Sequence, residues 1–208
     1  TNRHLKYSMP FVTGVLLAAG ASRRLAHRHP KQLLPVEGEP LVRRIAKQAL
    51  ASNLCEVLVI LGFSASRIEP FLSDLQIVIN INPAYNSGLS SSVKLGIQSL
   101  NPSAQAVIFI PGDQPFLSSE VINQLISKYE DSGARIVQPV YRKRRGSPLL
   151  FDHSLFPELL TIKGDEGGRQ IIANHRQDLA TVSLRSELPL LDVDTLEDYK
   201  NLIQDKKL

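Results

Sequence analysis

Asp113 is the carboxylate of this chain with the clearest setting for phosphate chemistry. It stands in the string PGDQP (111–115), directly after the apolar segment 105–110. A carboxylate just beyond the C-terminal end of a strand lies where open α/β sheets bind ligands, and its oxygens can hold Mg²⁺ beside phosphate oxygens. The alternative interpretation is an ordinary Gly-Asp-x-Pro turn, in which Asp113 only accepts backbone hydrogen bonds.

A loop of small and basic residues follows the first apolar segment. The string LAAGASRR (17–24) precedes Lys31. Backbone amides of small residues can approach a phosphate closely, and Arg24 and Lys31 supply positive charge to hold a triphosphate. The strings G-x-x-x-x-G-K-S/T and G-x-G-x-x-G are absent, which weakens kinase, GTPase and dinucleotide-binding interpretations. A small-residue turn with solvated arginines is the alternative.

Two further strings could contribute to the same chemistry. The string NPAYNSGLSSS (82–92) places a glycine and several hydroxyls before a helical pattern, which suits an anion or a base edge, or only an N-cap with spare serines. The string DVDTLED (192–198) is typical of a strand end that caps a helix, and complementarity to the helix dipole explains its acids. Asp192 or Asp194 could nevertheless reach the same metal as Asp113.

The elements that must position these residues alternate along the chain. Short β-branched segments are followed by segments of helical period, which predicts a mostly parallel sheet flanked by helices. Strands are expected at 11–19, 57–61, 76–81, 105–110, 136–140, 147–151 and 180–184. Helices are expected from 40, at 67–72, 91–100 and 119–129, around 156 and 169, and from 195. Without a repeat or a low-complexity linker, residues 11–208 are expected to form one domain, preceded by a disordered or non-native segment, 1–10.

Composition narrows the class of protein. With 43% hydrophobic and 21% charged residues, the chain is typical of a globular protein, and no apolar run approaches the roughly 20 residues of a membrane helix. Its single cysteine excludes an intramolecular disulfide, so a cytoplasmic location is expected. The net charge of +4 is mild, and the densest basic cluster, 142–145, suits small anionic ligands. Neither a nucleic acid nor a membrane is therefore expected as a partner.

Taken together, these strings resemble the molybdenum cofactor cytidylyltransferases, within the molybdopterin-nucleotide and NTP-transferase superfamily. The same family shares R-R-G-x-P-x-L-F (144–151), F-P-E-L-L (156–160), G-D-x-G-A/G-R (164–169) and D-I/V-D-T-x-E-D (192–198). The likeness covers nearly the whole chain. Ala26 stands where the family has glycine, which puts the conformation of that loop in doubt because glycine tolerates positive φ. Leu196 replaces the usual proline.

The resemblance implies a fold and an activity. The fold is a three-layer α/β, Rossmann-like and mostly parallel sheet of the nucleotide-diphospho-sugar transferase type. The activity is Mg²⁺-dependent transfer of CMP from CTP to the terminal phosphate of the molybdenum-molybdopterin cofactor, with release of pyrophosphate. A molybdenum hydroxylase is the partner protein expected to receive the product. The alternatives are use of GTP, another phosphorylated acceptor such as a sugar phosphate, or a non-catalytic cofactor-binding maturation factor for molybdenum hydroxylases.

The resemblance also assigns roles to individual residues. The catalytic residues are Arg24, Lys31 and Asp113. The nucleotide site comprises Leu17, Ala18, Ala19, Gly20, Arg24, Lys31, Asn82, Gly88 and Ser92. The acceptor site comprises Arg144, Arg145, Gly146, Asp165 and Arg169. The metal ligands are Asp113 and Asp194, with Asp192 as the less favoured candidate.

Overall fold

The computed structural model describes residues 9–21, 30–165 and 167–204. Most of the N-terminal segment expected to be disordered or non-native, and Arg24 among the expected catalytic residues, lie outside the described residues. Over the described part of the chain, no helix is long and apolar enough to cross a membrane.

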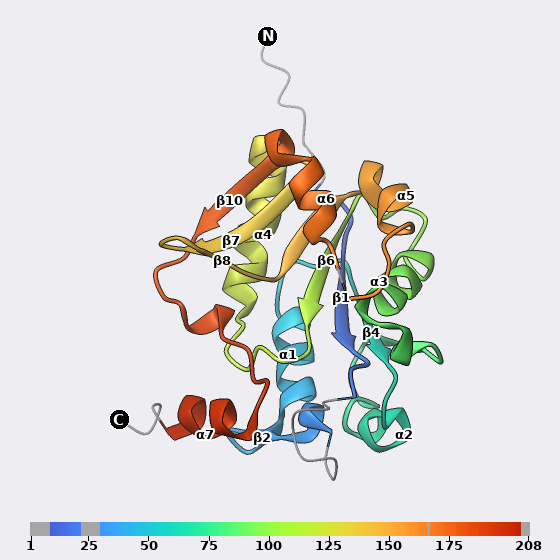
Figure 1. The fold of residues 1–208 in the computed structure, drawn as a ribbon, viewed down its shortest axis with the longest axis vertical. Coiled ribbons are helices and arrows are strands. Elements are labelled where there is room, and N and C mark those ends of the chain that lie inside the picture. The colour runs from blue at the N-terminus through green and yellow to red at the C-terminus, as the bar shows by residue number, and fades with distance from the viewer. Residues whose placement is uncertain (1–8, 22–29, 166, 205–208) are drawn as a thin grey trace.

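A mostly parallel sheet forms the centre of the molecule (Figure 1), and its strand order is β10-β7-β9-β6-β1-β4-β5, with β8 paired to β7. Strand β9 runs antiparallel to both neighbours, whereas β1, β4, β5 and β6 are parallel. The strands are β1 Val12–Ala18, β4 Glu56–Leu61, β5 Val78–Ile81, β6 Ala106–Pro111, β7 Ile136–Tyr141, β8 Arg144–Arg145, β9 Leu149–Asp152 and β10 Leu179–Ser183. The predicted fold class is confirmed.

Helices cover both faces of this sheet, as Figure 1 shows. They are α1 Leu41–Leu50, α2 Ala65–Ile68, α3 Leu89–Gln98, α4 Ser119–Ser132, α5 Phe156–Leu159, α6 Arg169–Asn174 and α7 Leu196–Gln204. Short 3-10 helices are η1 Lys31–Leu33, η2 Glu69–Phe71, η3 Tyr85–Ser87, η4 His153–Leu155, η5 Arg176–Asp178 and η6 Leu188–Leu190.

The buried side chains divide into two cores because successive strand residues point to opposite faces of a sheet. In β6, Ile108 and Ile110 pack with the buried faces of α1 and α4, while Val107 and Phe109 pack with α3, α5 and α6. Strands β1, β4 and β6 are buried on both faces, which explains why their sequences are continuously apolar rather than alternating.

The order of the strands creates the place for a ligand. The chain runs from β1 outward through β4 to β5 and then returns to β6 on the other side of β1. The carboxyl ends of β1 and β6 therefore meet at the point where the direction of winding reverses, which is where open α/β sheets bind ligands. The small-residue loop follows β1, and Asp113 follows β6.

The structure differs locally from the sequence prediction. The helix expected at 67–72 is α2 followed by η2, because Pro70 lacks an amide hydrogen and interrupts the α-helix. Strand β5 begins at Val78 rather than at 76, since β4 pairs only with residues 78–81. A short hairpin, β2 Pro35–Val36 with β3 Glu39–Pro40, was not predicted, because Glu37 at its turn adopts a positive φ of 52° that glutamate rarely takes.

Candidate active site

A cavity of about 540 Å³ opens at the carboxyl ends of β1 and β6. Its lining includes many of the residues expected to bind the nucleotide or the acceptor: Leu17, Ala19, Gly20, Lys31, Gly88, Ser92, Asp113 and Asp165. The lining also includes residues to which the sequence assigned no role: Ala21, Gln32, Tyr85, Asn86, Ser87, Leu89, Gly112 and Gly164. The structure therefore brings together most of the first three motifs at one opening.

Lys31 and Asp113 form the charged centre of this cavity. The Lys31 Nζ donates to Asp113 Oδ2 at 2.7 Å and lies 3.7 Å from Asp194 Oδ1. Both Lys31 and Asp113 are largely buried, with side-chain exposures of 14% and 23%. A charge pair with little access to water interacts more strongly than one on the surface. Here the Lys31 ammonium can neutralise the charge of a phosphate, and the Asp113 carboxylate can neutralise that of a bound cation.

Close backbone packing brings β6 to the end of β1. The Gly112 amide donates to the Leu17 carbonyl at 3.1 Å, and a Cβ on Gly112 would lie 2.7 Å from that same oxygen. A larger residue would push the two strand ends apart. Glycine at this position therefore allows Asp113 to lie beside the loop that follows β1.

Asn82 and the serines of α3 hold the third side of the cavity. Asn82 is only 3% exposed, and its Nδ2 donates to the hydroxyls of Ser91 and Ser92 at 2.9 and 3.0 Å. Its Oδ1 accepts from the Ala84 amide at 2.9 Å. Asn82 does not itself line the cavity. Its hydrogen bonds instead hold in place the segment that carries Gly88 and Ser92.

The Gly164–Asp165 turn lies against the N-terminus of α3. Asp165 Oδ1 accepts from the Leu89 amide at 3.0 Å, and the Gly164 carbonyl accepts from Ser90 at 2.9 Å. Gly88 has a φ of +95°, and a Cβ there would lie 2.6 Å from the Gly164 backbone. Segments far apart in the sequence therefore form one wall of the cavity, and Asp165 caps a helix within it.

A second, smaller cavity of about 190 Å³ adjoins the first. The two share Leu17, Leu89, Gly112 and Asp113. The rest of the second cavity is lined mainly by apolar side chains and glycines, namely Val93, Phe109, Pro111, Leu149, Phe151, Leu159, Gly167 and Gly168, together with Ser147. Asp113 therefore stands between a polar cavity and an apolar one.

Asp192 and Asp194, in the segment before α7, lie near Asp113. The Val193 amide donates to the Asp113 carbonyl at 2.8 Å, which holds the segment against the end of β6. Asp192 Oδ1 accepts from Gln114 at 2.9 Å. Although Asp192 retains solvent contact, nearby protein atoms reduce the hydration of its carboxyl group, and the charges of Asp113 and Asp194 add to this effect, so its pKa is raised.

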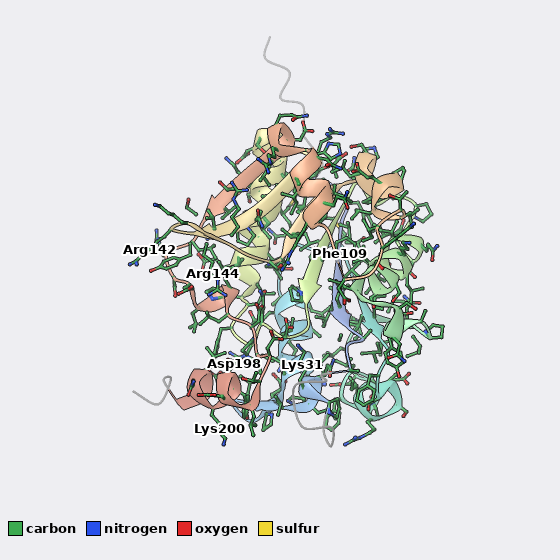
Figure 2. The ribbon with its side chains drawn as sticks, viewed as in Figure 1. Lys31, Phe109, Arg142, Arg144, Asp198 and Lys200 are labelled. Atoms are coloured by element: carbon green, nitrogen blue, oxygen red, sulfur yellow. The ribbon has the colours of Figure 1, made fainter. Side chains whose placement is uncertain are left out.

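The basic cluster lines neither cavity. Arg144 and Arg145 form β8, the second strand of a hairpin with β7, and both are exposed. Arg144 pairs with Glu187 at 2.7 Å, and the Arg142 guanidinium lies 5.1 Å from the centre of the Tyr141 ring. Figure 2 shows Arg142 and Arg144 toward the left edge of the view and Lys31 beneath the ends of the central strands. Gly146 and Arg169 likewise do not line either cavity.

Comparison with known proteins identifies the family. Residues 14–179 match the model of the MobA-like NTP transferase domain. The chain belongs to this family. Membership in this family makes it a nucleotidyltransferase-type protein. The family resemblance inferred from its motifs is confirmed.

Individual relatives of this MobA-like chain extend over almost its whole length. Nicotine blue oxidoreductase of Paenarthrobacter nicotinovorans is 32% identical over 205 residues, covering 94% of this chain and 98% of the relative. The purine catabolism protein PucB of Bacillus subtilis is 28% identical, covering 91% and 95%. The structure of Rv0371c from Mycobacterium tuberculosis is similar with a TM-score of 0.83 at 25% identity, covering 95% and 99%. Rv0371c has also been solved in complex with manganese, and that structure matches with a TM-score of 0.80.

The residues that the motifs missed have recognisable signals. Gln32 directly follows Lys31, and Tyr85 stands in the loop between Asn82 and Gly88. A position between two motif residues of a MobA-like NTP transferase domain is a reasonable candidate for the cavity wall. In contrast, nothing in the local sequence indicates that Gly164 would pack on Gly88.

Proposed function

We propose that this MobA-like protein transfers CMP from CTP to the terminal phosphate of a molybdopterin-type acceptor, with Mg²⁺ as the required cation. The observation that carries the proposal is the Lys31–Asp113 pair, at 2.7 Å, in a cavity that the small-residue loop after β1 also lines. An ammonium, backbone amides and a carboxylate around one opening are the groups that phosphoryl-type transfer requires.

The reaction needs no covalent enzyme intermediate. An oxygen of the acceptor's terminal phosphate attacks the α-phosphorus of CTP, the bond from that phosphorus to the bridging oxygen breaks, and pyrophosphate leaves with the electron pair. A phosphate monoester has a second pKa of about 6, so it is largely ionised at neutral pH and requires no strong general base. The protein has to position the two phosphates and neutralise their charge.

The residues of the nucleotide cavity divide this work. The amides of Ala19 and Gly20 would bind phosphate oxygens, and Lys31 would neutralise charge that gathers on the departing pyrophosphate. Arg24 is proposed to do the same from the loop outside the described residues. The remaining proposed nucleotide residues are Leu17, Ala18, Asn82, Gly88 and Ser92. Ala18 and Asn82 do not line the cavity, so they would act indirectly, by positioning the residues that do.

Asp113 and Asp194 fit a divalent cation. Both carboxylates approach the same ammonium nitrogen, at 2.7 and 3.7 Å, and carboxylate oxygens are the ligands that Mg²⁺ prefers. Within the described residues, no three His, Cys, Asp or Glu side chains are arranged to hold a metal on their own. The proposed site thus depends on phosphate oxygens to complete it. When bound, Mg²⁺ would neutralise charge on the triphosphate.

The choice of CTP rests on the strings LAAG and PGDQP, which in the related family go with cytidine. Ala19, the residue in which LAAG differs from LAGG, is 5% exposed and lines the cavity.

The acceptor is proposed to lie across Asp113 from the nucleotide. The smaller cavity is lined mainly by apolar side chains, including Phe109 and Phe151. A flat heterocycle can pack there, whereas the hydroxyls of a sugar phosphate would find few hydrogen-bonding partners. Further acceptor contacts are proposed from residues close in sequence to Ser147, Gly167 and Gly168 of this lining, namely Arg144, Arg145, Gly146, Asp165 and Arg169. A molybdenum hydroxylase is the proposed recipient of the product.

Pyrophosphate release tests the proposal. The purified protein is incubated with CTP, GTP, ATP or UTP, with and without Mg²⁺ and freshly prepared molybdenum cofactor. We expect release only when CTP, Mg²⁺ and the cofactor are all present. Asp113→Asn should abolish the release, whereas Asp74→Asn, which changes an exposed carboxylate paired with Arg43, should not.

Two results would redirect the proposal. Release with GTP or with a sugar phosphate would keep nucleotidyl transfer and change the substrate. No release with any nucleotide from folded protein that still binds the cofactor would favour the non-catalytic maturation role.

A further inference from the structure

Gln32 is a buried polar residue beside the nucleotide cavity that the proposed chemistry does not use. It follows Lys31 in η1, is 1% exposed and lines the cavity. Its Nε2 donates to the Ala18 carbonyl at 3.0 Å and to the Gly20 carbonyl at 3.1 Å. One amide group therefore holds two carbonyls in the first part of the small-residue loop.

These bonds fix the direction of the loop's amides. The Ala19 carbonyl accepts from the Phe63 amide at 3.0 Å, so the carbonyls of Ala18, Ala19 and Gly20 are all engaged by protein donors. A peptide unit is planar and trans, so its N–H points away from its own carbonyl oxygen. Fixing these carbonyls therefore fixes the N–H groups of the following residues, which are Ala19, Gly20 and Ala21. All of these residues line the cavity.

Apolar packing alone does not explain a glutamine at this position. Gln32 Oε1 is buried and has no hydrogen-bond partner among the described residues. A buried acceptor without a partner is unfavourable compared with an apolar side chain of the same shape. Methionine would avoid that penalty but would leave the Ala18 and Gly20 carbonyls without this donor, so the bonds to the loop are the feature that favours glutamine here.

We propose that Gln32 is a positioning residue for the triphosphate. Its side chain aligns the amides of Ala19 and Ala21 toward the phosphate oxygens, while the Phe63 amide holds the intervening Gly20 amide, and Gln32 lies next to Lys31 in the chain, so the amides and the ammonium group face one site. This inference rests on the proposed nucleotide site, and it adds a residue that acts on the nucleotide through the backbone.

Nucleotide binding to the Gln32→Met variant is the first test. We expect Mg²⁺-CTP to bind about tenfold more weakly, the effect of losing one or two aligned hydrogen bonds to a charged group. The thermal midpoint should change little, because removing the unpartnered oxygen and removing the donor to two carbonyls have opposite effects on stability. The amides of Ala19–Ala21 should exchange with solvent faster in the variant without ligand, a readout independent of activity.

Gln138→Met is the matched control. Gln138 is also buried, at 8% exposure, its Nε2 donates to the Gly146 carbonyl at 3.1 Å, and its Oε1 likewise lacks a partner among the described residues. It lies in β7, away from the larger cavity. We expect unchanged CTP affinity and unchanged exchange in the Ala19–Ala21 loop.

Gln32→Glu supplies a test with a pH-dependent sign. An ionised carboxylate would face the Ala18 and Gly20 carbonyls and could donate nothing to them, so CTP affinity should fall below that of the methionine variant at neutral pH. Protonation at lower pH restores one donor, so the deficit relative to the wild type should narrow as the pH falls.

The outcomes separate this inference from the proposed function. If the wild type binds CTP and Gln32→Met binds it equally well, with unchanged loop exchange, the positioning role is wrong while the nucleotide site stands. If the wild type binds none of the four nucleotides, the proposed function fails and the positioning role fails with it. A Gln32→Met protein of lowered thermal midpoint and unchanged CTP affinity would show a purely structural role.

Discussion

The ammonium nitrogen of Lys31 lies 2.7 Å from Asp113 Oδ2, although the two residues are 82 positions apart in the chain. The same nitrogen lies 3.5 Å from the Val193 carbonyl, in the segment near the C-terminus. Segments that follow β1, follow β6 and precede α7 therefore meet at one amine. The centre of the site is a product of strand order, because only the reversal of winding at β1 brings these segments together.

Replacing Lys31 with methionine should reduce nucleotidyl transfer by about 100-fold or more, because a preorganised charge near the leaving group is lost. Lys31→Arg should retain part of the activity, since the charge remains and only its position changes. Initial rates of pyrophosphate release measure the effect. Lys47→Met, which removes an exposed lysine paired with Glu39, serves as the control. A Lys31→Met protein with normal rates would contradict the assigned role.

Replacing Gly88 with alanine should impair both folding stability and nucleotide binding. Its φ of +95° and ψ of 174° are essentially limited to glycine, and forcing another residue there costs about 1–3 kcal/mol. The new Cβ would also lie 2.6 Å from the Gly164 backbone, which cannot move as a flexible side chain could. Thermal melting and CTP titration measure the two effects.

Gly133→Ala is the matched control for that substitution. Gly133 ends α4 with a φ of +62°, and a Cβ there would meet nothing within 4 Å. This variant should also melt at a lower temperature, yet bind CTP normally. Equal CTP affinities for both alanine variants would show that the Gly88–Gly164 contact does not shape the cavity.

Replacing Arg144 and Arg145 together with glutamine should raise the KM for the acceptor by about tenfold at low salt. The two arginines are exposed and precede Ser147, which lines the smaller cavity, so they are expected to attract a phosphorylated acceptor rather than to contact the nucleotide. The affinity for CTP should stay the same. The difference should shrink as salt is added, because salt screens exposed charges. Lys200→Gln, on α7, should change neither constant, and an equal effect from that control would indicate nonspecific electrostatics.

The Asp74 pair predicts a specific loss of stability in acid. Arg43 donates to both oxygens of Asp74, at 2.5 and 2.8 Å, and this lowers the Asp74 pKa from 3.8 to about 2. A lowered carboxyl pKa adds stability above the ordinary pKa, and that contribution is lost as the pH falls through the lowered one. The wild type should therefore melt slightly higher than Asp74→Asn at pH 5 to 7, with the gap closing between about pH 4 and 2. A gap that persists below pH 2 would argue against the ion pair as its source.

Local patterns in the sequence were sufficient to predict most of the sheet. The segments that became β1, β4 and β6 are continuously apolar, as strands buried on both faces must be. Helix α7 also begins where the string DVDTLED predicted a helix start. There the Thr195 hydroxyl accepts from the Asp198 amide, and the Asp198 carboxylate accepts from the Thr195 amide.

The candidate site was less accessible to sequence reasoning because its contacts are long-range. Lys31 and Asp113 could be named from their motifs, but their ion pair depends on the order of strands. The role of Asn82 depends on which groups its side chain meets, and these are serine hydroxyls of α3, of which Ser92 lines the cavity. For Asp165, the cap on Leu89 is a contact across 76 positions, which no local pattern indicates.

A crystal structure with Mn²⁺ and a CTP analogue that cannot be cleaved at the α-phosphate tests the account most directly, because the anomalous signal of manganese locates the cation independently of the protein density. The account predicts manganese bound to the carboxylates of Asp113 and Asp194, with the triphosphate against the amides of Ala19, Gly20 and Ala21 and near Lys31. Manganese and nucleotide bound together at a site that excludes Asp113 would contradict it.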